Sequence, residues 1–151
     1  PGTELHDRYP LQLISPHSRF SYHTLSDGKD SSVNDVEEHR VLVDGYYYWV
    51  ARMNPKDARA RGVAHHDLVR LHNDRGSVIC AAALTERLPS GVVQAYASSA
   101  VYDPIGEPGR SSDRGGCVNT LAPTRWQTEK TSASAPNSCL IEVEKWNGDR
   151  S

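Results

Sequence analysis

The sequence lacks the short motifs that identify three common classes of catalytic and nucleotide-binding proteins. It contains no GxSxG, no GxxxxGKS or GxxxxGKT, and no GxGxxG. A nucleophile elbow, a P-loop and a Rossmann dinucleotide turn are therefore without support. The chain offers no assembled catalytic centre, and we expect the domain by itself not to be catalytic.

Cysteine is scarce and unpaired. Cys80, Cys117 and Cys139 lie far apart, and no CxxC is present. A disulfide framework needs a denser, even set, so the pattern favours a reducing compartment, and we expect a cytoplasmic location. Cys80 and Cys139 lie in or beside predicted strands, which predicts buried packing roles. Cys117 follows two glycines, but no particular histidine can be assigned to activate it as a nucleophile.

Long apolar runs and an excess of basic residues are also missing. No run approaches the roughly 20 apolar residues needed to cross a bilayer, and the net charge is −2. We therefore expect neither a membrane span nor nucleic acid as the main partner. Because 151 residues with 37% hydrophobic residues can build one core, we predict a single domain over residues 1–151. The chain starts at Pro1 without an initiator methionine, which predicts an origin in a longer protein.

Helix-forming sequence is rare, and short β-type segments separated by Gly and Pro dominate. One helix is predicted from Pro55 to about Arg61, because Asn54 suits the N-cap, Pro55 the first turn and Gly62 the end. So many short strands with irregular connections indicate a mainly β fold, a compact barrel with one or a few short helices. The predicted strands are residues 11–14, 41–53 (with a turn at 43–45), 68–72, 77–84, 92–96, 118–121 and 140–145.

Hydrogen-bonding groups crowd into two predicted loops. Residues 15–24 follow a buried strand and include Arg19, whose planar fork of donors suits phosphate. Residues 114–127 include Gly115 and Gly116, which let backbone N–H groups approach a ligand, and Asn119, whose amide both donates and accepts. We predict that the two loops meet in a binding site. On these residues alone, a polar surface turn and an Asn119 bonded to its own backbone are the commoner explanations.

We interpret the neighbouring histidines and the loop charges as turn and surface residues and not as ligands. His65 and His66 precede a predicted strand, and side chains of adjacent strand residues point to opposite faces, so a shared metal is not expected. We interpret them as a turn. His17 and His23 have no third ligand nearby, so no metal site is predicted there either. Arg110 and Asp113 are interpreted as solvated loop charges.

Five segments, in the same order, resemble the C-terminal domain of the molybdopterin dinucleotide enzymes, the dimethyl-sulfoxide-reductase family. Each is weak alone, but together they span about residues 9–146 and are specific. One departure is His66, at a place where the family commonly has glycine, so the turn there must tolerate a side chain. Within the family, three segments look most similar to members that transfer hydroxyl groups between phenols: LISPHSRFSYHT at 13–24, HHDLVRLHNDRG at 65–76 and YDPIGEPG at 102–109. The five segments are LISPHSRFSYHT at 13–24, ARMNPKDA at 51–58, DLVRLHNDRG at 67–76, PSGVV at 89–93 and CVNTLAP at 117–123.

The resemblance implies a fold, a cofactor, partners and contacts. The fold would be a six-stranded double-psi β-barrel. The cofactor would be molybdopterin guanine dinucleotide, with its molybdenum or tungsten held by the parent enzyme, a molybdenum-dependent oxidoreductase or hydroxytransferase. The partners would be the remaining domains of the parent large subunit and, as a further expectation, an iron–sulfur small subunit. The cofactor-binding residues carried over from the family would be Ser15, His17, Arg19, Ser21, His23 and Thr24 in the first loop and Asn119 in the second, with Gln127 added for its closeness to the second loop in sequence.

A function of a different class stays open. A stand-alone, non-catalytic double-psi barrel that binds a protein or peptide would also lack a catalytic set. Against it, residues 15–24 carry groups compatible with phosphate and purine rather than exposed apolar anchors. In the first interpretation the domain fixes the dinucleotide and orients the pterin, while the redox or hydroxyl-transfer chemistry belongs to the metal centre.

Overall fold

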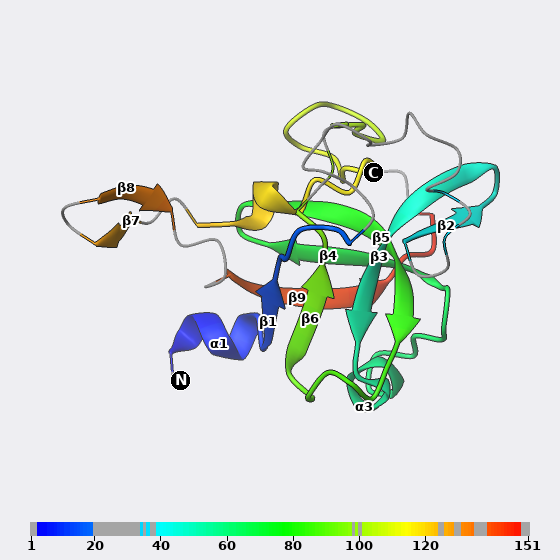
Figure 1. Ribbon diagram of the computed structural model, residues 1–151, viewed down its shortest axis with the longest axis horizontal. Helices are drawn as coiled ribbons and strands as arrows, with labels where there is room; N and C mark the ends of the chain where they lie inside the picture. The colour runs from blue at the N-terminus through cyan, green and yellow to red at the C-terminus, as the bar shows by residue number, and fades with distance from the viewer. Residues whose placement is uncertain are drawn as a thin grey trace.

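The computed structural model describes residues 3–19, 34, 36, 39–97, 99, 101–123, 126–128, 131–134 and 139–148. Within them the chain is mainly β, as predicted, with two short α-helices and one 3-10 helix (Figure 1). No helix of this described part is long and apolar enough to span a membrane. The helices are α1 (Glu4–Arg8), α3 (Pro55–Arg59) and η1 (Val118–Leu121), and the strands are β1 (Leu11–Ile14), β2 (Arg40–Val43), β3 (Tyr46–Met53), β4 (Leu68–Asn73), β5 (Gly76–Leu84), β6 (Val92–Ala95), β7 (Trp126–Thr128), β8 (Thr131–Ser134) and β9 (Cys139–Lys145).

Seven strands form one sheet in the order β2-β3-β5-β4-β9-β1-β6, and β3 pairs in addition with β6. The β1/β6 and β3/β5 pairs are parallel and the other pairs are antiparallel. The β7–β8 hairpin lies apart from this sheet (Figure 1). Because β1 and β6 run parallel, the loops that follow Ile14 and Ala95 leave the sheet at the same edge. β3 runs antiparallel to β6, with Ala51 opposite Ala95, so the start of β3 lies at that edge too.

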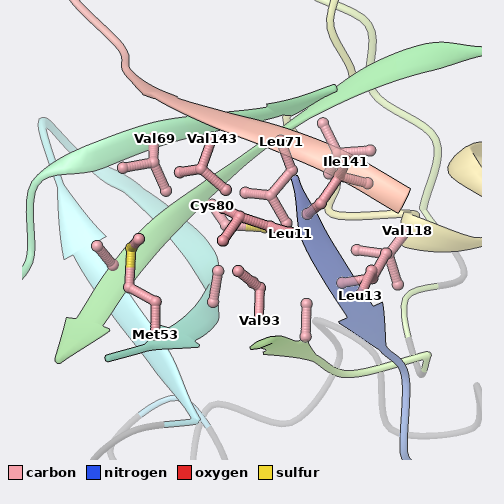
Figure 2. Close-up of a cluster of buried hydrophobic side chains, with 14 of the residues drawn as sticks. Leu11, Leu13, Met53, Val69, Leu71, Cys80, Val93, Val118, Ile141 and Val143 are labelled. Carbon is pink, nitrogen blue, oxygen red and sulfur yellow. The ribbon is translucent and has the colours of Figure 1, made fainter. Parts of the chain in front are cut away.

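The core follows from the alternation of side chains along the strands. Leu11 and Leu13 are buried while Gln12 between them is exposed, the period-two pattern of a strand with one face inward. β5 is central in the sheet, between β3 and β4, and is buried on both faces from Val78 to Ala83. Figure 2 shows the inward side chains of several strands and of η1 converging on one cluster: Leu11, Leu13, Met53, Val69, Leu71, Cys80, Val93, Val118, Ile141 and Val143.

The predicted capped helix is confirmed, although it ends at Arg59 rather than about Arg61. The Asn54 side chain accepts a hydrogen bond from the Lys56 N–H at 2.9 Å and donates to the Leu88 carbonyl at 2.7 Å. Pro55 stands at the start of the helix, where it loses no helical hydrogen bond. Asp57 is buried and accepts from Ser90 Oγ at 2.6 Å and from the Gly91 N–H at 2.8 Å, which ties α3 to the loop before β6.

One local prediction is confirmed and another needs correction. The turn predicted at 43–45 is confirmed, because Asp44 and Gly45 both have positive φ (47° and 80°), and this tight hairpin turn divides residues 41–53 into two strands. Residues 118–121 form the 3-10 helix η1 and not a strand. Val118 and Leu121 are three residues apart and both buried, so the apolar spacing that suggested a strand is satisfied by one helical turn.

Candidate functional site

The first polar loop leaves the sheet directly after β1, and its described part is residues 15–19. Ser15 is half-buried, His17 and Arg19 are exposed, and Ser18 is buried. The Ser18 hydroxyl lies 3.2 Å from Nδ1 of the buried His39. Ser21, His23 and Thr24, also predicted as site residues, lie outside the described residues.

The second loop is organised by one buried carboxylate. Asp113 is 1% exposed. Its Oδ1 accepts the N–H groups of Asp103 and Gly115, both at 2.8 Å, and its Oδ2 accepts the Cys117 N–H at 2.8 Å. Its backbone also pairs with β5, since its N–H donates to the Ser77 carbonyl and its carbonyl accepts from Ile79. The interpretation of Asp113 as a solvated charge was therefore wrong. The sequence feature that could have indicated the buried role of Asp113 is its position two residues before a Gly-Gly pair.

The two glycines of this loop are required by packing. A Cβ atom on Gly115 would lie 1.9 Å from the Val101 carbonyl oxygen, and one on Gly116 would lie 2.4 Å from Cδ1 of Trp49. Gly116 also has φ +82°, a conformation that side-chain-bearing residues rarely adopt. Because the Gly115 N–H is bonded to Asp113, this glycine lets the loop fold closely on its own scaffold rather than leaving that N–H open to a ligand.

A chain of side-chain contacts joins the two loops. Ser18 meets His39, the His39 and Trp49 rings are 4.9 Å apart in an edge-to-face arrangement, and Trp49 packs against Gly116. Trp49 is 2% exposed and His39 is 1% exposed, so the contact chain is shielded from water. No local sequence pattern indicated that His39 and Trp49 would connect the two loops.

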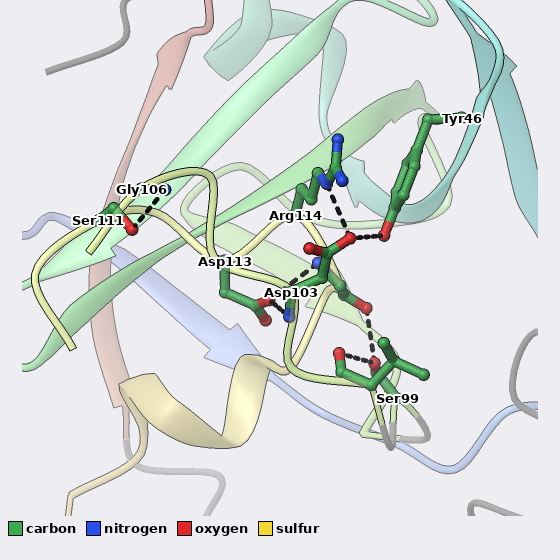
Figure 3. A network of polar contacts seen from close by, with 9 residues as sticks. Tyr46, Ser99, Asp103, Gly106, Ser111, Asp113 and Arg114 are labelled. Carbon is green, nitrogen blue, oxygen red and sulfur yellow. Dashed lines mark hydrogen bonds and ion pairs between the residues drawn. The ribbon is translucent and has the colours of Figure 1, made fainter. Parts of the chain in front are cut away.

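A second connection, through Ala97 and Ser99, joins the same loops. The Ala97 N–H donates to the Pro16 carbonyl at 3.1 Å. Two residues further on, the buried Ser99 hydroxyl donates to the Gly115 carbonyl at 2.6 Å (Figure 3). The structure thus brings residues 15–19 and 114–117 together at one edge of the sheet, as the site hypothesis requires.

Asn119 and Gln127, the remaining predicted contacts, follow this loop. Asn119 lies on η1 and is exposed. Its side-chain amide makes no hydrogen bond with any described residue, so bonding to its own backbone is not what the described structure shows. Gln127 belongs to β7, whose side chains lie outside what the structure describes.

An ion pair fixes the outer side of the second loop. Arg114 Nε lies 2.7 Å from Asp103 Oδ2, and the Tyr46 hydroxyl donates to the same oxygen at 3.1 Å (Figure 3). The Arg114 guanidinium also lies over the Tyr46 ring, 4.6 Å from its centroid. Burial, followed by the hydrogen bond to Asp103, raises the pKa of Tyr46 to about 12, so the phenol stays a donor. Hydrogen bonding to Asp103 raises the Arg114 pKa. The Asp103 charge is thereby compensated.

The remaining predicted polar groups are structural. His65 and His66 stack with ring centroids 3.9 Å apart in a turn, and His66 has φ +67°. The turn therefore tolerates a side chain, as predicted, although the expectation that the rings diverge was wrong. No cluster of three metal-ligating side chains occurs among the described residues. Burial raises the thiol pKa of Cys80 to about 12 and of Cys139 to about 11, in agreement with packing roles. Arg110 is exposed, as predicted, and it pairs with Glu107.

A pocket of about 610 Å³ lies where η1 ends, and sequence reasoning did not predict it. Its walls combine apolar groups with charged groups of the β4–β5 turn. Asp74 there is engaged by the Tyr9 hydroxyl at 2.7 Å and by Arg8 at 3.0 Å. The described lining residues are Thr3, Leu5, Tyr9, Asn73, Asp74, Arg75, Leu121, Pro123, Cys139 and Leu140.

Comparison with known proteins connects this geometry to a family. The family model described as "Molydopterin dinucleotide binding domain" matches residues 11–140. The chain is 54% identical over 143 residues to the pyrogallol hydroxytransferase large subunit of Pelobacter acidigallici, covering 95% of this chain and 16% of that protein. It is 33% identical over 146 residues to a dimethyl sulfoxide/trimethylamine N-oxide reductase of Rhodobacter capsulatus, covering 93% of this chain and again 16% of the relative.

Among solved structures, acetylene hydratase from Pelobacter acetylenicus has a similar fold. The TM-score is 0.59 at 16% sequence identity, over 95% of this chain and 19% of that one. At this identity the likeness concerns the fold alone. The chain spans about a sixth of the length of the two relatives named above.

Proposed function

The chain belongs to the molybdopterin dinucleotide-binding domain family, and we propose that it binds molybdopterin guanine dinucleotide through residues 15–19 and 114–119. One observation carries the proposal: the two segments lie together at one edge of the sheet. They are joined there by the contacts from Ser18 through His39 and Trp49 to Gly116.

The donors at this edge fit an anionic dinucleotide. The fork of Arg19 suits a phosphate oxygen, and hydroxyl and imidazole groups of Ser15 and His17 supply further polar contacts. The two nearby carboxylates do not oppose an anion, because Asp103 is paired with Arg114 and Asp113 accepts three backbone N–H groups.

Recognition of a flat heterocycle would fall to Asn119. Its exposed amide offers a donor and an acceptor together, the combination that the edge of a pterin or guanine presents. Ser21, His23, Thr24 and Gln127 would complete the contacts. In this proposal the chain's residues hold and orient the cofactor, and the bound cofactor supplies a redox-active metal centre.

We propose further that the sheet is a six-stranded double-psi barrel. Its support is that β3 pairs with both β5 and β6, so the order β3-β5-β4-β9-β1-β6 returns to β3. The β2–β3 hairpin would then extend beyond the barrel.

The context of the domain is also a proposal. Because the chain spans about a sixth of the relatives named above, we propose that it is one domain of a larger molybdenum or tungsten enzyme. We propose further the C-terminal position that the sequence resemblance implies, an iron–sulfur small subunit as a partner and a cytoplasmic location. The name of the 54% identical relative favours hydroxyl transfer between phenols as the parent reaction. A stand-alone peptide-binding barrel is not favoured, since membership of a cofactor-binding family accounts for the missing catalytic set.

Hydrogen–deuterium exchange on the full-length enzyme, with and without its cofactor, tests the binding site. We expect cofactor to slow exchange in residues 15–19 and 118–121 and to leave the turn at 64–67 unchanged. Protection spread evenly over the domain, or centred on the 64–67 turn, would contradict the proposed site.

A further inference from the structure

Exposed apolar side chains gather on the segment that leads into the second loop. Of the large apolar side chains that are exposed in the described part of the chain, three lie within this one short stretch: Val101 (46%), Tyr102 (47%) and Ile105 (37%). Ile105 also borders a pocket of about 330 Å³ whose other described lining residues include Arg114 and Trp146. We call Val101, Tyr102, Ile105 and this pocket the 101–105 patch. Clustered exposed apolar groups commonly mark interaction surfaces.

The backbone beneath the patch is held in place at several points. The Asp103 N–H donates to Asp113 Oδ1 at 2.8 Å, and the Ile105 N–H donates to the Ser112 carbonyl at 3.0 Å. The Tyr102 hydroxyl accepts the Gly109 N–H at 2.8 Å. The segment therefore presents its apolar side chains outward on a fixed support, which lowers the entropic cost of docking.

The charges around the patch are already paired. Asp103 binds Arg114 at 2.7 Å, and Glu107 lies 3.4 Å from Arg110. An apolar surface with compensated charges suits packing against another protein surface better than capture of a charged ligand.

Resting on the proposed function, we propose that the 101–105 patch is the docking surface for another domain of the same polypeptide. The relatives extend far beyond the matched region, which is 16% of their length. Three side chains and a small pocket are far less than the roughly 800 Å² per partner that stable complexes of separate molecules use. A tethered domain needs less, because the linker gives it an effective concentration of about millimolar. Since Asp113 and Arg114 support both the patch and the second loop, the docked domain would lie beside the cofactor site.

Cysteine labelling in the full-length enzyme tests this assignment. Ile105→Cys and, as a matched control, Leu42→Cys would be labelled with a maleimide in the native enzyme and in urea, and the modified peptides quantified by mass spectrometry. Leu42 is 56% exposed and stands opposite Tyr47 on the β2–β3 hairpin, away from the face of Tyr46 that meets Asp103. If Ile105→Cys does not fold, Val101→Cys replaces it.

For each variant, the labelling rate in urea is divided by the rate in the native enzyme. We expect this ratio to be at least about tenfold larger at position 105 than at position 42, because a docked domain must open before the thiol reacts. Equal ratios would show an open patch and overturn the proposal. Protection that disappears when other subunits are removed from a still-folded large subunit would assign the patch to a separate chain and also overturn it. The labelling does not depend on cofactor contacts, so a failure here leaves the proposed function standing and is distinguishable from a failure of the cofactor assignment.

Discussion

Trp49 lies so close to Gly116 that a Cβ atom on Gly116 would sit 2.4 Å from the indole Cδ1. The same indole meets His39 edge to face, and His39 meets Ser18 of the first loop. One buried aromatic side chain therefore sets the position of two loops that are distant in sequence. The site depends on this packing as much as on the polar residues that would contact a ligand.

Replacing Gly116 with alanine should destabilise the protein strongly. The positive φ costs about 1 kcal/mol for a residue with a side chain, and overpacking against Trp49 adds about 1–3 kcal/mol. Gly45→Ala is the matched control, because Gly45 has φ +80° but a Cβ atom added there would have no neighbouring atom within 4 Å, so only the backbone cost applies. Urea unfolding of the two variants measures the difference. Equal losses would contradict the close packing of Trp49 on Gly116.

The Asp113→Asn variant should lose about 2–4 kcal/mol, since an amide cannot accept all three N–H groups and leaves a buried donor unsatisfied. Hydrogen exchange of the Gly115 and Cys117 amides should be faster in this variant than in the wild type. Asp74→Asn serves as the control: its side chain is 54% exposed and pairs with Arg8, so we expect a loss of less than about 1 kcal/mol. A loss at Asp113 no larger than at Asp74 would show that the carboxylate does not organise the loop.

Tyr46 should give the stability a dependence on alkaline pH. Its folded pKa is raised to about 12 from 10.0, first by burial and then by the hydrogen bond to Asp103. A raised folded pKa means that the stabilisation by neutral Tyr46 is complete below pH 10 and is lost as the pH rises towards 12. The advantage of the wild type over Tyr46→Phe, about 1 kcal/mol near neutral pH, should therefore shrink across that window. Denaturant unfolding as a function of pH measures this difference, and a constant difference would contradict the role of Tyr46 as a half-buried donor to Asp103.

The parts of the fold governed by local chemistry were predictable. Asn54 and Pro55 start α3 as their capping properties require, and β1 follows from the short run at Leu11. Residues 118–121 were mistaken for a strand, because a short apolar pair fits a strand or one helical turn equally well. In the site, the loops at 15–24 and 114–127 were predicted to meet, and residues 15–19 and 114–117 of them do lie together. The contacts that join the loops were not predicted. Asp113, His39 and Trp49 act through contacts between segments that are distant in sequence, and such contacts leave no local pattern.

Asn119 should contribute to cofactor retention in the full-length enzyme without affecting its folding. Its amide makes no hydrogen bond with the described residues, so Asn119→Ala removes only contacts to a ligand. We expect retention to fall by about tenfold, since a lost hydrogen-bonding contact of about 1.4 kcal/mol corresponds to that factor. Arg110→Ala, at an exposed position paired with Glu107, should retain its cofactor. Equal cofactor content in the two purified variants would remove Asn119 from the site.

The most direct test of the binding site is the cofactor content of Arg19 variants of the full-length enzyme. A charge-assisted bond to a phosphate oxygen is worth about 1.5–3 kcal/mol, so Arg19→Ala should lower retention of the dinucleotide by about 10- to 100-fold. Arg19→Lys should recover only part of it, because an ammonium group lacks the planar fork. The measurement is the metal and guanine nucleotide released per folded protein. Low occupancy in Arg19→Ala with partial recovery in Arg19→Lys is the predicted result, and full occupancy in Arg19→Ala would contradict the assignment of the first loop to the cofactor.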